Sequence, residues 1–154
     1  MICLLQNVPG AVLRDEENMN NNISNIKSHV YVKRAQEAIE LYRESFRLEK
    51  GECILDNDGK IWHCVLTRNG EEYISISEEK YLPDTLLKEY PNDIRPIMLF
   101  KVEFDNEDEL KKAFKLLSKD GNPCSGLKVE PWSIISCDII DKFGVFWYLI
   151  VWKH

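Results

Sequence analysis

The sequence predicts an α+β protein made of two copies of a βαβββ module, whose strands form a curved mixed sheet. The main observation is an internal repeat: a short β-prone run, an amphipathic helix and three strand-like runs occur in this order twice, about 70 residues apart. A second observation is the composition, because 44% hydrophobic and 30% charged residues are typical of a folded globular chain. A length of 154 residues suits one domain with its own core.

The first module is predicted over 26–80. It opens with the β-prone run 28–32, and a helix follows whose apolar residues recur at intervals of three and four. The dipeptides Asp58-Gly59 and Asn69-Gly70 are typical hairpin turns and separate the next three strands. The apolar helix positions are Ala35, Ala38, Ile39, Tyr42 and Phe46, and the three strands are expected at 52–55, 61–67 and 72–77.

The second module is predicted over 97–154, after a proline-containing connector at 81–96. Asn106, three residues before Glu109, is a capping-box signal for a second helix, which should stop at Gly121. Because each helix covers one sheet face, the other face needs cover from the partner half or from a second subunit. Strands are expected at 98–104, 126–130, 133–140 and 145–152, the last two joined by the turn 141–144.

Charge and hydropathy exclude several classes of partner. The 26 acidic and 20 basic residues give a net charge of −6, which disfavours nucleic acid and anionic lipid as partners. No apolar run approaches the length of a membrane span, and the N-terminus has no basic segment before its apolar run, so we expect a cytoplasmic protein. Residues 1–25 are polar and rich in asparagine, which predicts a weakly ordered arm with Met19 as an alternative start.

The cysteine pattern favours reduced thiols. Five cysteines are scattered along the chain without a CxxC pair, which argues against a disulfide framework and against structural zinc. Cys64 and Cys137 lie in predicted strands with no adjacent basic residue. We therefore expect both to be buried, inert thiols.

Several segments resemble the vicinal-oxygen-chelate superfamily, which contains glyoxalases, bleomycin-resistance proteins and extradiol dioxygenases. The C-terminal run WSIISCDIIDKFGVFW, from Trp132 to Trp147, is similar to the ending of its PhnB-like branch. The segment VKRAQEAIELY from Val32 to Tyr42, and His63 in IWHCVLTRNG, also resemble that branch. The resemblance implies paired βαβββ modules, a homodimer and a small-molecule pocket inside the curved sheets. The label 3-demethylubiquinone-9 3-methyltransferase is often attached to the branch, but no glycine-rich methyl-donor loop follows the first strand here.

The resemblance also indicates where a metal would be bound in related enzymes. The corresponding ligand positions fall at Lys27, near Leu99, at Trp147 or Tyr148, and within 76–78. The residues at the first three positions cannot ligate a cation, and a catalytic ion normally needs three protein ligands. We therefore predict no metal, no cofactor and no assigned catalytic residue.

The predicted site is a pocket for an unidentified small organic molecule. His29 lies two residues after Lys27 and so points to the same side of its strand, where it either lines this pocket or lies in the core. His63 is either a hydrogen-bond donor to the ligand or a packing residue. Tryptophan and tyrosine side chains in strands are typical of cavities that hold planar or apolar ligands. The predicted ligand-binding residues are His29, Tyr31, His63, Ser75, Ser77, Trp132 and Trp147.

Two other functions remain open at this point. One is a divalent-metal enzyme of glyoxalase or dioxygenase type, which would need His29, His63 and either Glu78 or Glu103 to converge. The other is an antibiotic-sequestering resistance protein, which differs from the first interpretation only in its ligand.

Overall fold

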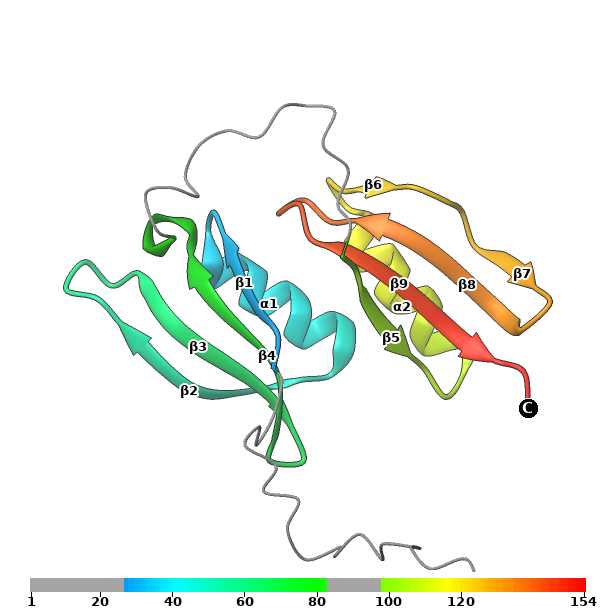
Figure 1. Ribbon diagram of the computed structural model, residues 1–154, viewed down its shortest axis with the longest axis horizontal. Helices are drawn as coiled ribbons and strands as arrows, with labels where there is room; N and C mark the ends of the chain where they lie inside the picture. Colours follow the sequence, from blue (N-terminus) through cyan, green and yellow to red (C-terminus); the bar gives the residue numbers. More distant parts are fainter. Residues whose placement is uncertain (1–26, 83–97) are drawn as a thin grey trace, which may run out of the picture.

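The structure, a computed structural model, describes residues 27–82 and 98–154 (Figure 1). The predicted arm at 1–25, the alternative start at Met19 and most of the connector at 81–96 lie outside the described residues. The described chain contains two mixed sheets, each with one helix behind it, so the predicted α+β architecture of two modules is confirmed.

The first module forms a four-stranded sheet with strand order β1-β4-β3-β2. Strands β1 and β4 run parallel, and the other neighbours are antiparallel. The Asn69-Gly70 hairpin forms as predicted, because both residues adopt the positive φ angles of a primed turn, 52° and 80°. The elements are β1 (His29–Val32), α1 (Ala35–Phe46), β2 (Glu49–Leu55), β3 (Ile61–Arg68), β4 (Glu71–Glu78) and the 3₁₀ turn η2 (Glu79–Tyr81).

The second module repeats this topology with strand order β5-β9-β8-β6, and β5 and β9 run parallel. The strand expected at 126–130 is shorter, Lys128–Glu130, and an unpredicted two-residue strand, Asn122–Pro123, precedes it; both pair with β8. Between them the amides of Cys124 and Ser125 both donate to the carbonyl of Asp138, which interrupts the regular ladder. The elements are β5 (Phe100–Glu103), α2 (Glu107–Ser118), β6 (Asn122–Pro123), β7 (Lys128–Glu130), β8 (Ser133–Ile140) and β9 (Phe146–Trp152).

The two helices begin in different ways. Asn106 caps α2 as predicted, because its side chain accepts a hydrogen bond from the Glu109 amide at 3.0 Å. No capping residue precedes α1, and the Glu78 carboxylate at the end of β4 accepts from the Ala35 amide at 2.9 Å instead. The N-terminus of α1 is therefore capped from a strand 43 residues later in the chain.

Helix α2 ends at Ser118, three residues before the predicted stop at Gly121. Gly121 does not end the helix, but the chain packs too closely at this position for any side chain. A Cβ atom built there would lie 2.5 Å from the carbonyl oxygen of Leu117 and 2.9 Å from that of Ile140. The close approach of the helix end to the end of β8 therefore depends on the missing side chain.

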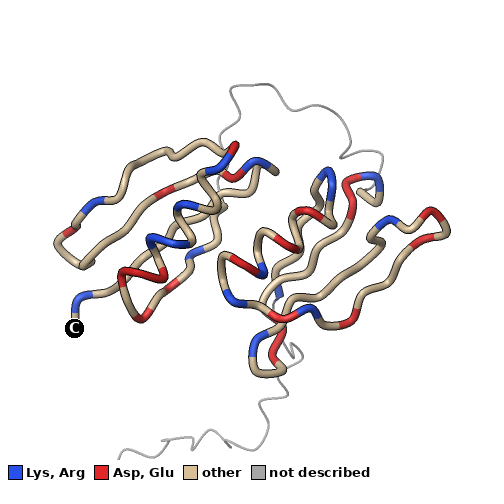
Figure 2. Tube along the Cα trace, turned by 180° about the vertical axis from the view of Figure 1, so that it is seen from behind, with Lys and Arg blue, Asp and Glu red and all other residues tan. Residues whose placement is uncertain are grey.

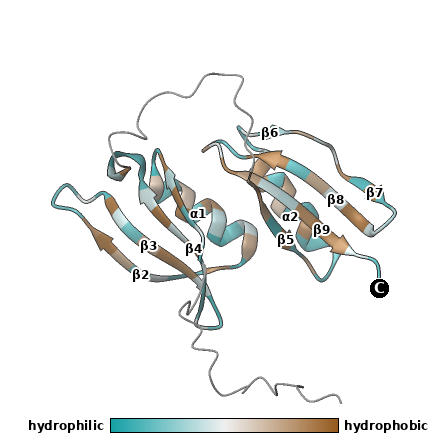
Figure 3. Cartoon of the chain, viewed as in Figure 1, coloured by the Kyte–Doolittle hydropathy of each residue, from teal (hydrophilic) through white to brown (hydrophobic). Residues whose placement is uncertain are grey.

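The core lies between each sheet and its helix. Figure 3 shows apolar residues along the strands and hydrophilic residues at the hairpin turns. The side chains of Ala35, Ala38, Ile39 and Tyr42 on α1 are fully buried, as the apolar periodicity predicted. Leu110, Ala113 and Leu117 are the equivalent residues of α2.

A buried carboxylate joins the two modules. Asp141, 3% exposed, accepts hydrogen bonds from the Tyr42 hydroxyl and the Trp147 indole, both at 2.8 Å. Its other oxygen accepts from the amides of Phe143 and Val145. The predicted turn at 141–144 is thus tied to α1 of the first module.

Both helices lie behind the sheets in Figure 1 and in front of them in Figure 2, which views the chain from the opposite side. The two sheet faces without a helix, called the open faces below, therefore point to the same side of the chain. The sheets lie next to each other, so neither sheet covers the open face of the other.

The prediction of Cys64 as an inert thiol is wrong. Cys53 and Cys64 are directly opposed in the β2-β3 register, with their Cα atoms 4.0 Å apart, and they form a disulfide. Directly opposed residues of antiparallel strands bring their side chains within bonding reach, which a count of cysteines does not reveal. Cys137 is buried as expected, and burial raises the pKa of its thiol to about 12.

Candidate functional site

Five of the seven predicted ligand-binding residues lie on the open face of the first sheet. The parallel register of β1 and β4 pairs His29 with Ser75 and Tyr31 with Ser77. The alternating Val30 and Val32 are buried against α1, so His29 and Tyr31 point to the other side. The four residues His29, Tyr31, Ser75 and Ser77 therefore lie on one face of the first sheet.

Strand β3 adds His63 to the same face. Its neighbour Cys64 pairs with Ile76 and is fully buried on the helix side, so His63 points to the open side. The imidazoles of His29 and His63 stack with their ring centroids 5.4 Å apart. The centroid of the Tyr31 ring also lies 4.6 Å from that of His29, so His29 contacts a flat ring from β1 and one from β3.

Ser77 determines the tautomer of His29. Its hydroxyl donates its one proton to the Trp62 carbonyl oxygen at 2.6 Å, and its Oγ lies 2.9 Å from His29 Nε2. Since the hydroxyl proton is already used, Nε2 of His29 must be the donor in this contact. The lone pair of a neutral His29 therefore resides on Nδ1.

The surroundings of His29 favour its neutral form. Partial enclosure of the ring lowers its pKa below the ordinary value, the neighbouring His63 lowers it further, and Glu72 opposes both effects. A neutral imidazole with its Nε2 proton held by Ser77 offers a hydrogen-bond acceptor at Nδ1. Such a group can accept a hydrogen bond or a proton from a bound molecule.

Glu72 is a residue of this face that the sequence analysis missed. The Ser75 hydroxyl donates to its carboxylate at 2.6 Å, and Lys27 forms an ion pair with it. The bonds from Lys27 and Ser75 hold the pKa of Glu72 below its usual range. A register shift after Leu66 changes the pairing of β3 with β4, and strand alternation from sequence could not anticipate it.

Trp132 and Trp147 lie apart from this group. Trp132 is 51% exposed, and its indole donates to the Tyr148 hydroxyl at 3.3 Å on the open face of the second sheet. Trp147 is buried between the modules, where its ring packs against Phe46 at a centroid distance of 4.8 Å. Within one chain the seven predicted residues therefore do not form a single site.

The structure also separates the residues of the metal-enzyme alternative. Glu78 points to the helix side, where it caps α1, and Glu103 belongs to the second sheet. Neither carboxylate joins His29 and His63 on the open face. Within 27–82 and 98–154, no three His, Cys, Asp or Glu side chains are close enough to hold a metal ion.

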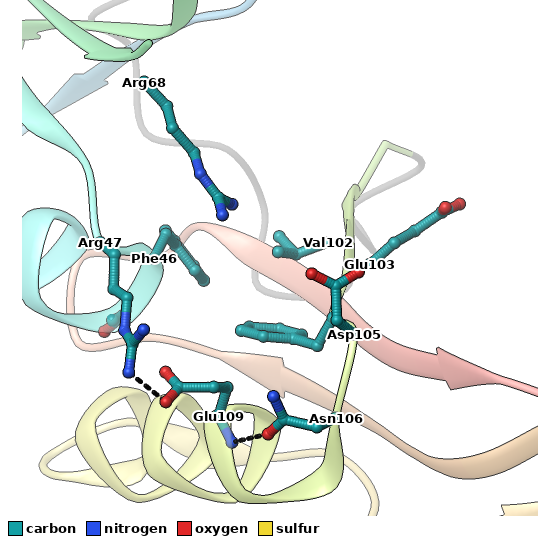
Figure 4. Close-up of a pocket in the computed structure, with 10 residues that line it drawn as sticks. Phe46, Arg47, Arg68, Val102, Glu103, Asp105, Asn106 and Glu109 are labelled. Carbon is teal, nitrogen blue, oxygen red and sulfur yellow. Dashed lines mark hydrogen bonds and ion pairs between the residues drawn. The ribbon is translucent and has the colours of Figure 1, made fainter.

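Two adjoining cavities lie between the modules and were not anticipated. The larger has a volume of about 320 Å³ and is floored by Phe46, Phe100 and Trp147. The smaller, about 110 Å³, shares Phe46 and Arg68 with it and reaches the start of α2 (Figure 4). No sequence motif marks them, because their walls come from segments of both modules that meet only in the fold.

No protein-family model matches the sequence, and neither does any curated protein. Solved structures do resemble the chain. The PhnB protein of Bacillus cereus, described as a 3-demethylubiquinone-9 3-methyltransferase, has a TM-score of 0.67 at 24% identity, covering 82% of this chain and 98% of that one. A glyoxalase/bleomycin resistance protein/dioxygenase family enzyme from Burkholderia phytofirmans has a TM-score of 0.62 at 9% identity, covering 82% and 97%. The fosfomycin resistance protein FosX of Listeria monocytogenes has a TM-score of 0.57 at 12% identity, covering 85% and 95%.

These similarities show the fold. The chain has the glyoxalase/bleomycin resistance/dioxygenase fold, as the resemblance of its C-terminal run and of its first helix implied. The neighbours include enzymes and resistance proteins, so the fold alone does not choose among the three functions considered above. Neither helix of the described segments is long and apolar enough to cross a membrane.

Proposed function

We propose that the chain is a PhnB-like member of the vicinal-oxygen-chelate superfamily that binds a small organic molecule as a homodimer without a metal ion. The single observation that carries the proposal is the group of His29, Tyr31, His63, Ser75 and Ser77 on one open sheet face. Polar groups with fixed hydrogen bonds beside flat rings are typical of small-molecule sites. A cytoplasmic location belongs to the same proposal.

The orientation of the open faces supports the homodimer. Both point to the same side of one chain, so a closed pocket requires a second copy with its sheets facing the first. Large apolar side chains remain exposed, with Tyr31 and Ile54 on the first open face and Trp132 next to Tyr148 on the second. Exposed apolar patches of this kind are typical of surfaces that a partner covers. In this arrangement Trp132 of the second copy would complete the site around His29.

The electrostatics of the face support a metal-free site. A metal ion would need a third ligand beside the two imidazoles, and the nearest carboxylate on this face, Glu72, is paired with Lys27. A metal cation that bound Glu72 would have to displace the ammonium group of Lys27. The face is therefore better suited to hydrogen bonding with an uncharged or weakly polar ligand than to coordination of a cation.

The proposal is tested by thermal unfolding of the full chain with manganese, nickel or zinc, and with fosfomycin or bleomycin in the presence and absence of each metal. A ligand at a hundred times its dissociation constant raises the free energy of unfolding by about 2.7 kcal/mol. We expect no stabilisation by metal alone, and we expect that any stabilisation by an antibiotic does not need metal. The metal-enzyme alternative would be favoured if one metal stabilised the chain, if His63→Gln abolished this stabilisation, and if the surface variant Lys112→Gln kept it.

A further inference from the structure

We propose that the cleft between the two modules is a second binding site, which takes an aromatic carboxylate. The site is the larger of the two cavities, about 320 Å³, together with the adjoining smaller one. This volume is within the range of pockets that hold small ligands, and it suits a molecule of one or two rings. The site does not include His29 or His63, so it goes beyond the proposed function.

The floor of the cleft is a preformed aromatic surface. The Trp147 ring contacts Phe46 at a centroid distance of 4.8 Å and Phe100 at 5.2 Å. Its orientation is fixed, because its indole nitrogen donates to the buried Asp141. Leu48, Ile74 and Val102 complete the apolar lining. A flat apolar ligand can stack on this surface without reordering side chains.

Arg68 gives the cleft a free positive charge. It is the last residue of β3, and its guanidinium group projects into the cleft toward Phe46 and Val102 (Figure 4). Neighbouring basic residues are neutralised, since Arg47 pairs with Glu109 and Lys101 with Glu103. Among the ion pairs of the described segments, none involves Arg68. A planar guanidinium with unused donors matches a carboxylate, which can accept two parallel hydrogen bonds from it.

A second polar group in the cleft also lacks a partner. Ser45 lines the smaller cavity, is 5% exposed, and its hydroxyl makes no hydrogen bond within the described structure. A buried polar group without a partner is unfavourable, but the Ser45 oxygen has almost no exposed surface, so a ligand reaches it only if the cavity wall moves. The apolar floor and the free guanidinium together select a ligand with a ring and an anionic group, whose carboxylate must lie beside Arg68 and away from the Asp105 carboxylate of the smaller cavity.

The test is isothermal titration calorimetry of the full chain with 2-naphthoate, benzoate, 2-naphthamide and acetate. The amide keeps the ring and removes the charge, whereas acetate keeps the charge and removes the ring. We expect 2-naphthoate to bind most tightly, and both the amide and acetate to bind at least about tenfold more weakly. The affinity for 2-naphthoate should also fall with added salt, because Arg68 is exposed to solvent at one side.

Variants locate the binding. Arg68→Gln should weaken the binding of 2-naphthoate roughly 10- to 100-fold, the range expected for a charge-assisted hydrogen bond. The matched change at the exposed Arg34, the residue before α1, is Arg34→Gln, which should not alter this affinity. His63→Gln should also leave it unchanged, which separates this site from the open face. NMR spectra should show a shift of the Trp147 indole signal on binding. Equal affinities of 2-naphthoate and 2-naphthamide, no effect of Arg68→Gln, no binding at millimolar concentration, or shifts confined to the first open face would each overturn the proposal.

Discussion

The hydroxyl of Tyr42 in α1 donates a hydrogen bond to the carboxylate of Asp141, 99 residues later, at 2.8 Å. Asp141 follows β8 in the second module, so this bond connects the two halves of the repeat across their buried boundary. The indole of Trp147 donates to the same oxygen, and two backbone amides donate to the other. The Asp-x-Phe-Gly turn and the following tryptophan, which carried the family resemblance, thus have a structural role in this chain.

Tyr42→Phe is expected to lower the free energy of unfolding by about 1.5–3 kcal/mol, because it removes a hydrogen bond to a buried charged group. The measurement is chemical denaturation at neutral pH. The matched control is Tyr73→Phe, since Tyr73 is 53% exposed. Equal stability of the two variants would show that the bond to Asp141 does not hold the modules together.

The same pair predicts a dependence on alkaline pH. Burial and the adjacent Asp141 raise the pKa of Tyr42 well above its ordinary value. Above pH of about 10 the unfolded chain loses this proton while the folded chain keeps it, so stability is full below that pH and falls as pH rises further. Chemical denaturation of the wild type and of Tyr42→Phe at several pH values measures this loss of stability. The free energy of unfolding of the variant should fall less as pH rises, and an equal fall in both proteins would contradict the prediction.

Gly121→Ala is expected to destabilise the chain by about 1–3 kcal/mol, the usual cost of forcing an extra methyl group into a packed region. The new Cβ would meet the carbonyl oxygens of Leu117 and Ile140, which are backbone atoms and cannot rotate away. Gly126→Ala is the control, because nothing lies within 4 Å of a Cβ built there. Thermal unfolding measures both variants. A lower stability of Gly126→Ala than of Gly121→Ala would contradict the account.

His29 should titrate below the ordinary histidine pKa, because partial enclosure and the adjacent His63 disfavour its charged form. The unfolded chain then binds more protons as pH falls below about 6.5, so this histidine makes the folded state less stable at acidic pH. NMR titration of the imidazole measures the midpoint directly. Ser77→Ala should in addition change the ring nitrogen signals, since Ser77 fixes the Nε2 proton; signals identical to the wild type would contradict the assigned tautomer.

The Cys53–Cys64 disulfide predicts a mass shift on reduction. The oxidised chain should gain the mass of two hydrogen atoms when reduced, and the variant Cys53→Ser should not. Reduction should lower the free energy of unfolding by at most about 3 kcal/mol, because the closed loop is short. Alkylation followed by mass spectrometry checks the pairing. Labelling of Cys64 without prior reduction would contradict it.

The repeat and its helices were predictable because amphipathic periodicity and turn residues are local signals. The capping of α2 by Asn106 and the Asn69-Gly70 hairpin both follow from residues within four positions of each other. The first half of the site was predictable for the same reason, since strand alternation places His29 and Tyr31 on one face.

What could not be predicted depends on pairing between distant segments. The disulfide of Cys53 and the position of Glu72 both depend on strand register, which is set by the whole sheet. The cleft around Arg68 and Phe100 exists only after the two modules pack against each other. Trp147 is the clearest case, because its strand was predicted correctly while its side chain, predicted to bind the ligand, packs against Phe46 of the other module.

The central claim, a homodimer that holds a small organic molecule without a metal, is tested most directly by native mass spectrometry of the untagged chain before and after denaturation. The account predicts a species of twice 18.1 kDa, with any bound mass released on denaturation being organic. A dimer that releases stoichiometric zinc, nickel, iron or manganese, or a chain that remains monomeric at all concentrations, would contradict it.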